Sequence, residues 1–147
     1  MSSTTASPSS EENRTTTTSR VVLAALIAVV AALVGNTVIA QLALTFGASD
    51  DFTPLTPSAY GFFTVVGVIA GLIGWLLVRR TAKAPTTLRW LVPAVLVLSL
   101  APDVLLGFSD RAGVSWGAVV ALMLMHVIVT VAAVVTFSRV LPVSRNP

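Results

Sequence analysis

Four long apolar stretches, separated by short polar segments, constrain this chain more than any other feature of its sequence. They cover approximately residues 21–46, 58–78, 88–108 and 114–137. Each is close to the about 20 residues that a helix needs to cross about 30 Å of hydrocarbon. None alternates polar and apolar residues as the strands of a membrane β-barrel do. We therefore predict an all-α fold in which residues 20–142 form a four-helix transmembrane bundle with up-down-up-down topology.

The composition agrees with this fold class. Of the 147 residues, 55% are hydrophobic and only 10% are charged, whereas a soluble globular protein has about 25% charged residues. The chain contains no cysteine, which excludes a disulfide, a thiolate metal site and a thiol nucleophile. Residues 1–19 are rich in Ser and Thr and have too few apolar residues to form a core, so we predict a disordered tail there. Residues 143–147 form a second, short tail.

The basic residues predict how the bundle is oriented. All but Arg111 of the nine Lys and Arg residues lie in the two tails or in the segment between the second and third stretches. By the positive-inside rule, both termini and that segment face the cytoplasm. Asp50, Asp51 and Asp110 then face outward. We expect a multi-pass protein of the bacterial plasma membrane, with the lipid bilayer as its surroundings. The basic residues act as topology determinants, and we expect no binding to nucleic acid.

Three glycines of the second stretch share one helix face. Gly67, Gly71 and Gly74 are spaced at i, i+4 and i+7, and Thr64 lies one turn earlier. Small residues let helix backbones approach closely in lipid. We expect this face to pack against another helix of the same chain or, as the alternative, to form the seam of a homo-oligomer.

Polar side chains inside the apolar stretches are the candidate site, because ionisable residues in a membrane span mark function by default. Helical rise places four of them in the outer half of the bundle, namely Asn36, Ser99, Asp103 and His126. Either they form interhelical hydrogen bonds that only hold the bundle together, or they take part in transport of protons or a small solute. Asp103 alone has a further alternative, which is hydration at the outer interface.

Asp103 and His126 are within reach of each other if the third and fourth stretches pack side by side. Counting from opposite ends places Asp103 about 6–9 Å further out than His126. The turn of residues 109–113 between the two stretches favours that adjacency. The side chains then meet directly, through Ser99 or through a water molecule.

The sequence contains no catalytic constellation. It has one histidine, no glycine-rich phosphate loop and no nucleophile with a matching base outside the predicted spans. Thioether and imidazole groups bind copper(I), and Met123 shares a helix face with His126. Met125 points elsewhere, so the chain offers too few ligands for a copper site. We predict that the protein is not an enzyme and that it needs neither a metal nor another cofactor. A structural, interaction or regulatory role is our first hypothesis for its function.

Several short segments resemble a family of small four-helix membrane proteins from actinobacteria that is known only as a domain of unknown function. The resemblance covers about residues 20–142 and implies a bacterial plasma-membrane protein, but it implies no activity, ligand or site residue. The small multidrug transporters, which also have four helices, are a poorer match, because their first span carries an essential glutamate where this chain has Asn36 and Gln41. The segments that carry the resemblance are Gly35-Asn36, the acidic loop before residue 58, Arg79-Arg80, Leu98 to Asp103 and Ala121 to His126.

Overall fold

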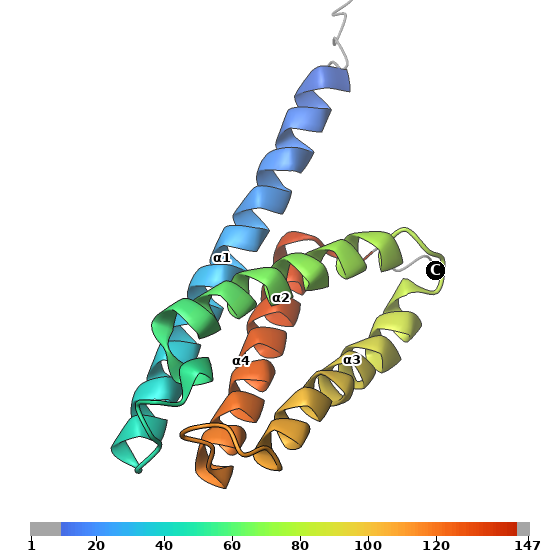
Figure 1. Ribbon diagram of the computed structural model, residues 1–147. Coiled ribbons are helices and arrows are strands. Elements are labelled where there is room, and N and C mark those ends of the chain that lie inside the picture. The colour runs from blue at the N-terminus through green and yellow to red at the C-terminus, as the bar shows by residue number, and fades with distance from the viewer. Residues whose placement is uncertain (1–9, 144–147) are drawn as a thin grey trace, which may run out of the picture.

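The chain folds into four long helices and one short 3-10 turn, and no strand occurs within residues 10–143, which the computed structural model describes. All four helices are long and apolar enough to cross a membrane. This arrangement confirms the predicted all-α, four-helix fold (Figure 1). The elements are α1 (Ser10–Thr45), η1 (Thr53–Leu55), α2 (Pro57–Val78), α3 (Ala84–Gly107) and α4 (Trp116–Val140).

The first helix begins earlier than the sequence predicted. We predicted a disordered tail over residues 1–19 and the first span from about residue 21, whereas α1 begins at Ser10. Once the apolar stretch has nucleated a helix, each further residue adds a backbone hydrogen bond at little cost, and no proline after Pro8 interrupts it. Residues 1–9 lie outside the described part of the chain.

Two other helix starts have clear local causes. α3 begins at Ala84, four residues before the predicted boundary, because Pro85 is favourable in the first turn of a helix. α4 begins two residues later than predicted, since Ser115 caps it by accepting a hydrogen bond from the Ala118 N–H at 3.2 Å.

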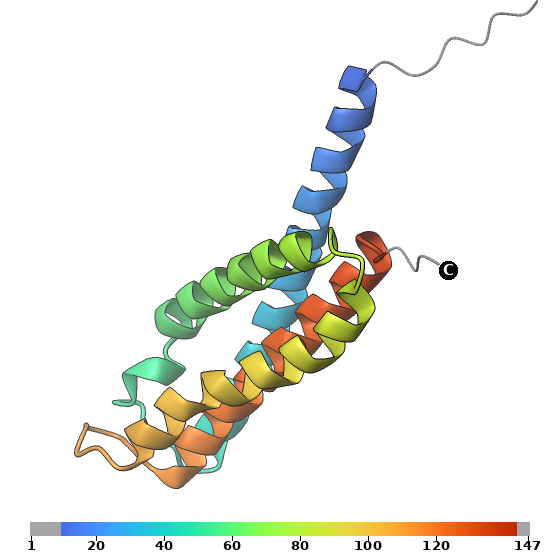
Figure 2. The same cartoon turned by 90° about the vertical axis from the view of Figure 1, so that its right-hand side faces the viewer.

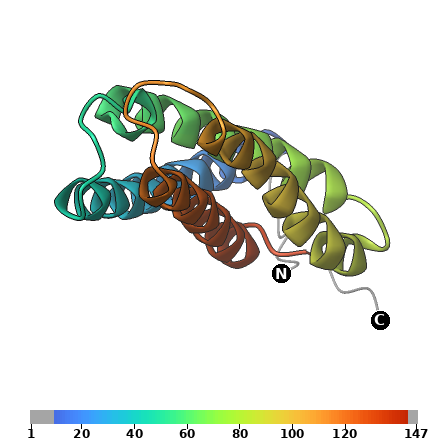
Figure 3. The ribbon, with the colours of Figure 1, turned by 60° about the horizontal axis from the view of Figure 1, so that its bottom comes forward.

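Consecutive helices run in opposite directions, and α4 contacts each of the other three. Its most extensive contact is with α1, whereas α3 packs mainly against α4 and touches α2 little (Figures 2 and 3). The start of α1, the α2–α3 connection and the end of α4 lie toward one end of the molecule, and α1 extends past the other helices there (Figures 1 and 2). Segments 46–56 and 108–115 lie at the opposite end.

A stripe of alanines on α1 forms the tightest seam of the bundle. Ala24, Ala28, Ala32 and Ala40 lie on one helix face at spacings of four or eight residues, and each is at most 1% exposed. Gly35 lies next to this stripe, and a Cβ atom added to it would be 2.5 Å from Cγ2 of Ile128 in α4. Only residues without bulk allow backbones to approach this closely. We call these four alanines the α1 seam.

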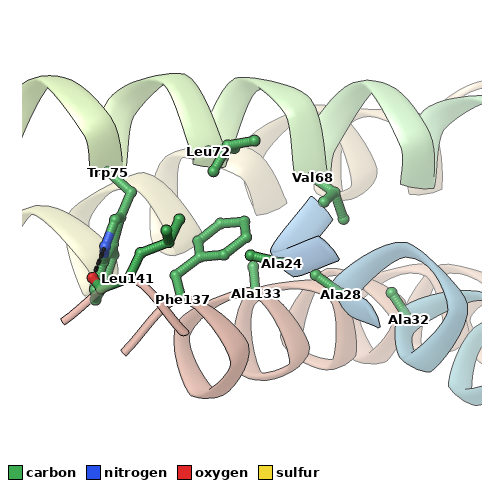
Figure 4. Packing of buried hydrophobic residues seen from close by; sticks show 9 residues of the cluster. All are labelled: Ala24, Ala28, Ala32, Val68, Leu72, Trp75, Ala133, Phe137 and Leu141. Carbon is green, nitrogen blue, oxygen red and sulfur yellow. Dashed lines mark hydrogen bonds between the residues drawn. The ribbon is translucent and has the colours of Figure 1, made fainter. Parts of the chain in front are cut away.

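A cluster of apolar side chains joins the α1 seam to α2 and α4 (Figure 4). The indole N–H of Trp75 donates a hydrogen bond to the Leu141 carbonyl oxygen at 3.0 Å, and the ring centroids of Trp75 and Phe137 are 5.9 Å apart. The Leu141 carbonyl lies past the end of α4, where carbonyl groups have no partner within the helix. The end of α2 is therefore fixed to the end of α4. The cluster comprises Ala24, Ala28, Ala32, Val68, Leu72, Trp75, Ala133, Phe137 and Leu141.

The two connections at the opposite end of the bundle pack against each other. Gly113 has φ +74°, a backbone conformation that favours glycine, and a Cβ atom there would lie 2.7 Å from the backbone nitrogen of Phe52. Phe52 is 2% exposed and belongs to a second apolar cluster. Its other members are Ala40, Leu55, Tyr60, Ala118, Ala121, Leu122 and Met125.

The α1 seam generates a prediction about stability. Ala28→Leu places extra methylene groups into a fully buried position and should lower the free energy of unfolding by about 1–3 kcal/mol. Ala31→Leu is the matched control, because Ala31 is exposed on the same helix. Unfolding in mixed micelles, followed by circular dichroism, measures both variants. Equal stability of the two would contradict the assignment of the seam.

Candidate functional site

Asp103 and His126 meet between α3 and α4. Asp103 lies in the last turn of α3 and its side chain is 10% exposed, whereas the side chain of His126 is 39% exposed. Their Oδ2 and Nδ1 atoms are 3.0 Å apart, and within residues 10–143 they form the one ion pair between described side chains if the histidine is protonated. The structure thus places these two predicted residues in direct contact, without Ser99 between them.

The same ring nitrogen also faces a backbone carbonyl. Nδ1 of His126 is 3.0 Å from the Leu122 carbonyl oxygen, one turn earlier in α4. A carbonyl only accepts, so Nδ1 must carry the hydrogen and point it toward Leu122. This explains why Oδ2 of Asp103 lies at ion-pair distance and yet receives no well-aligned hydrogen bond from a described residue.

A close aromatic contact holds the two helices together near this pair. The rings of Phe108 and Trp116 stack edge to face with centroids 5.2 Å apart. A Cβ atom at Gly107 would be 2.9 Å from the Trp116 ring, so a larger residue there would push the two helices apart. This contact therefore fixes the end of α3 beside the start of α4, which keeps the helix that carries Asp103 next to the helix that carries His126.

Asn36 does not join Asp103 and His126. Its side-chain N–H donates to the Thr64 hydroxyl at 2.7 Å, and the residue is 2% exposed. One turn away on the same two helices, the hydroxyl groups of Thr37 and Tyr60 are 3.1 Å apart. Asn36 and Thr37 of α1 thus contact polar groups of α2. We had predicted instead that Asn36 lies beside polar groups of α3 and α4. Oδ1 of Asn36 has no hydrogen-bond partner among the described residues.

Ser99 is also absent from the contact. Its hydroxyl donates to the Leu96 carbonyl oxygen of the same helix at 2.7 Å. Any serine in a helix can donate such a hydrogen bond to a carbonyl group of the preceding turn. The predicted cluster of four residues is therefore not formed, because two of its members found nearer partners.

The glycine face of α2 lines a cavity instead of a tight helix contact. Added Cβ atoms would be 3.7 Å from Val129 at Gly67 and 3.9 Å from Phe137 at Gly71, and would meet nothing within 4 Å at Gly74. At Gly67 and Gly71 these distances are ordinary van der Waals contacts with α4, so part of this face packs against another helix of the chain, whereas Gly74 faces open space. Since α3 contacts α2 little, α2, α3 and α4 line a partly open cavity of about 330 Å³. Its remaining walls are Ala70, Trp75, Leu88, Leu91, Val92, Val95, Thr130, Ala133 and Val134.

Sequence reasoning missed two of these features. The i+4 spacing of Ala24, Ala28 and Ala32 follows the same rule that we applied to the glycines, so the α1 seam was detectable. The pairing of Asn36 with Thr64 depends on the relative rotation of α1 and α2, which no pattern in the sequence indicates. In the described part of the chain, no group of three or more His, Cys, Asp and Glu side chains is placed to hold a metal ion.

These observations define the class of protein as a four-helix bundle whose helices are long and apolar enough to span a membrane, with an Asp–His pair between α3 and α4 and an apolar cavity. The chain belongs to the family of unknown function DUF6069, whose sequence model matches residues 12–143. This confirms the resemblance to a family known only as a domain of unknown function. Comparison with curated proteins and with solved structures gave no match.

The contact between Asp103 and His126 predicts a coupling energy. In a double-mutant cycle with Asp103→Ala and His126→Ala, unfolding in micelles should reveal about 0.6–2 kcal/mol of coupling, as for other polar contacts between membrane helices. The cycle of Ser99→Ala with His126→Ala is the control and should be additive, because Ser99 bonds within its own helix. Coupling of equal size in both cycles would rule out a specific pair.

Proposed function

We propose that the protein is a multi-pass membrane protein with a structural, interaction or regulatory role, and that it is neither an enzyme nor a transporter. A membrane location is supported by the large apolar side chains that the helices expose, such as Val30 (60%), Ile73 (55%) and Leu98 (73%). Exposed apolar surface of this extent is unfavourable in water, whereas lipid tails solvate it.

The observation that carries the proposal is the separation of the polar residues from the cavity. None of Asn36, Ser99, Asp103 and His126 lines the cavity, and the polar side-chain groups of its wall are the Thr130 hydroxyl and the Trp75 indole N–H. A path for protons or polar solutes needs polar groups along a space that water can reach. The Asp103–His126 and Asn36–Thr64 contacts instead act as polar links between neighbouring helices.

We infer that the protein lies in the bacterial plasma membrane with both termini in the cytoplasm. Arg79, Arg80 and Lys83 belong to the α2–α3 connection, at the same end as the start of α1 and the end of α4. Asp50, Asp51 and Asp110 belong to the connections at the opposite end. The positive-inside rule orients such a molecule with its basic end in the cytoplasm.

Reporter fusions test this orientation. After Lys83, a reporter that works only in the cytoplasm should be active and one that works only outside the cell should not. After Asp51, the reverse should hold. Arg79→Asn/Arg80→Asn in the fused chain tests whether these charges set the orientation, with Arg111→Asn as control. An external signal from the Lys83 fusion of the parent chain would overturn the proposed topology.

A transporter of protons or a small solute is the second candidate. It is favoured by the Asp103–His126 contact, because acidic and histidine side chains form proton relays in pumps and transporters and the side chain of His126 is 39% exposed. This candidate requires a conformation in which water reaches the pair from both sides of the membrane in turn.

Proteoliposomes distinguish the two candidates. We expect a pH gradient to decay no faster in vesicles that contain the protein than in protein-free vesicles, because the cavity does not connect to the pair. Asp103→Asn should then change nothing, and Asp110→Asn in the external connection is the matched control. Faster decay with the parent chain, lost in Asp103→Asn and retained in Asp110→Asn, would establish the transporter instead.

A further inference from the structure

The cavity between α2, α3 and α4 has the chemistry of a site for an apolar chain. Apart from the hydroxyl of Thr130 and the indole N–H of Trp75, its wall side chains are aliphatic or aromatic, and the glycines add only backbone. The indole N–H is already bound to the Leu141 carbonyl oxygen. A guest in this space therefore gains van der Waals contact and finds almost no hydrogen-bonding group.

One end of this cavity lies next to a segment of the chain that carries four cationic residues. Arg79 follows the cavity residue Trp75 by one helical turn and caps α2, with its backbone N–H bonded to the Trp75 carbonyl oxygen at 2.9 Å. Arg89 directly follows the cavity residue Leu88. Arg80 and Lys83 lie in the connection between these helices. We call Arg79, Arg80, Lys83 and Arg89 the basic end of the cavity.

No described acidic side chain neutralises the basic end. The one ion pair between described side chains is that of Asp103 and His126, near the other end of α3. Arg80, Lys83 and Arg89 are exposed, and Arg79 is half-buried. Apolar walls that lead to uncompensated cations match a molecule that has an apolar chain and an anionic head.

We propose that the cavity holds an acyl chain of one anionic phospholipid, whose phosphate is bound by the basic end. Basic pockets between membrane helices recognise anionic lipid headgroups in this way. The proposal depends on the membrane location proposed above, but not on the role of Asp103 and His126 or on which side of the membrane the basic end faces.

A second copy of the chain fits the cavity less well. A two-fold contact through this face, with both copies inserted in the same direction, would bring the basic ends of the two copies together. Like charges at one seam repel each other, whereas a phosphate between them would be attracted. The charge at the cavity end therefore favours the lipid.

Spin-labelled lipids in vesicles of phosphatidylcholine that contain the intact chain provide the test. Electron spin resonance gives the relative association of labelled phosphatidylglycerol and labelled phosphatidylcholine with the protein. We expect phosphatidylglycerol to be preferred and Arg79→Gln/Arg80→Gln to lower the preference about 25-fold, since each of the two basic groups near the surface contributes about a fivefold factor. Arg111→Gln, at the opposite end, should leave it unchanged.

Two pairs of variants separate the cavity from the general lipid surroundings. Gly74→Leu fills the cavity, and Gly61→Leu is its control on the same helix, because an added Cβ atom meets nothing within 4 Å at either position. Val95→Phe fills the cavity from α3, and Val97→Phe, which does not line it, is the second control. Both filling variants should lose the preference for phosphatidylglycerol, and both controls should keep it.

The outcomes that overturn the site are distinct from failure of membrane insertion. Equal association of both lipids with the parent chain, or a preference that survives Gly74→Leu and Val95→Phe, would overturn the site. Dimers that Gly74→Leu converts to monomers without any lipid preference would instead assign the cavity to a second copy. Extraction of the chain from the same vesicles by alkaline carbonate would contradict the proposed membrane location itself.

Discussion

The close approach of α1 to α4 is the contact on which the rest of this structure depends. Lipid tails are as apolar as leucine, so helices inside a membrane gain little from hiding apolar surface and associate through dense packing. The α1 seam supplies that density, because its alanines keep the two backbones near each other. With α1 fixed, α4 presents its other faces to α2 and α3, and each of these helices packs on a base that is already rigid.

Polar contacts then fix the rotation and the ends of the helices. Asn36 with Thr64 sets α1 against α2, and Trp75 ties the end of α2 to the Leu141 carbonyl. Each of these contacts satisfies buried groups that would otherwise be costly in a medium without water. Apolar packing alone tolerates sliding and rotation of one helix on another, whereas hydrogen bonds at defined positions do not.

The third helix is held differently, and this difference creates the cavity. Near its end, α3 is fixed to α4 by the Asp103–His126 contact and by Phe108 on Trp116. It has little contact with α2, so part of the glycine face of α2 remains open. A helix fixed at one end beside a face of small residues leaves a space that the chain itself does not fill. The polar pair and the apolar space are thus separate features of the same α3–α4 arrangement.

From the sequence alone we could predict the all-α class, the approximate limits of the four long helices, and that Asp103 is within reach of His126 if the third and fourth helices pack side by side. Those follow from the length of the apolar runs and from helical rise, which act along the chain. The partners of Asn36, Ser99 and the glycines were decided only by the tertiary structure. Spacing along a helix shows which residues share a face, but the neighbour of that face depends on how each helix rotates and tilts. In this protein α1 makes the most extensive contact with α4, whereas the glycine face of α2 touches α4 at Gly67 and Gly71 and also lines the cavity.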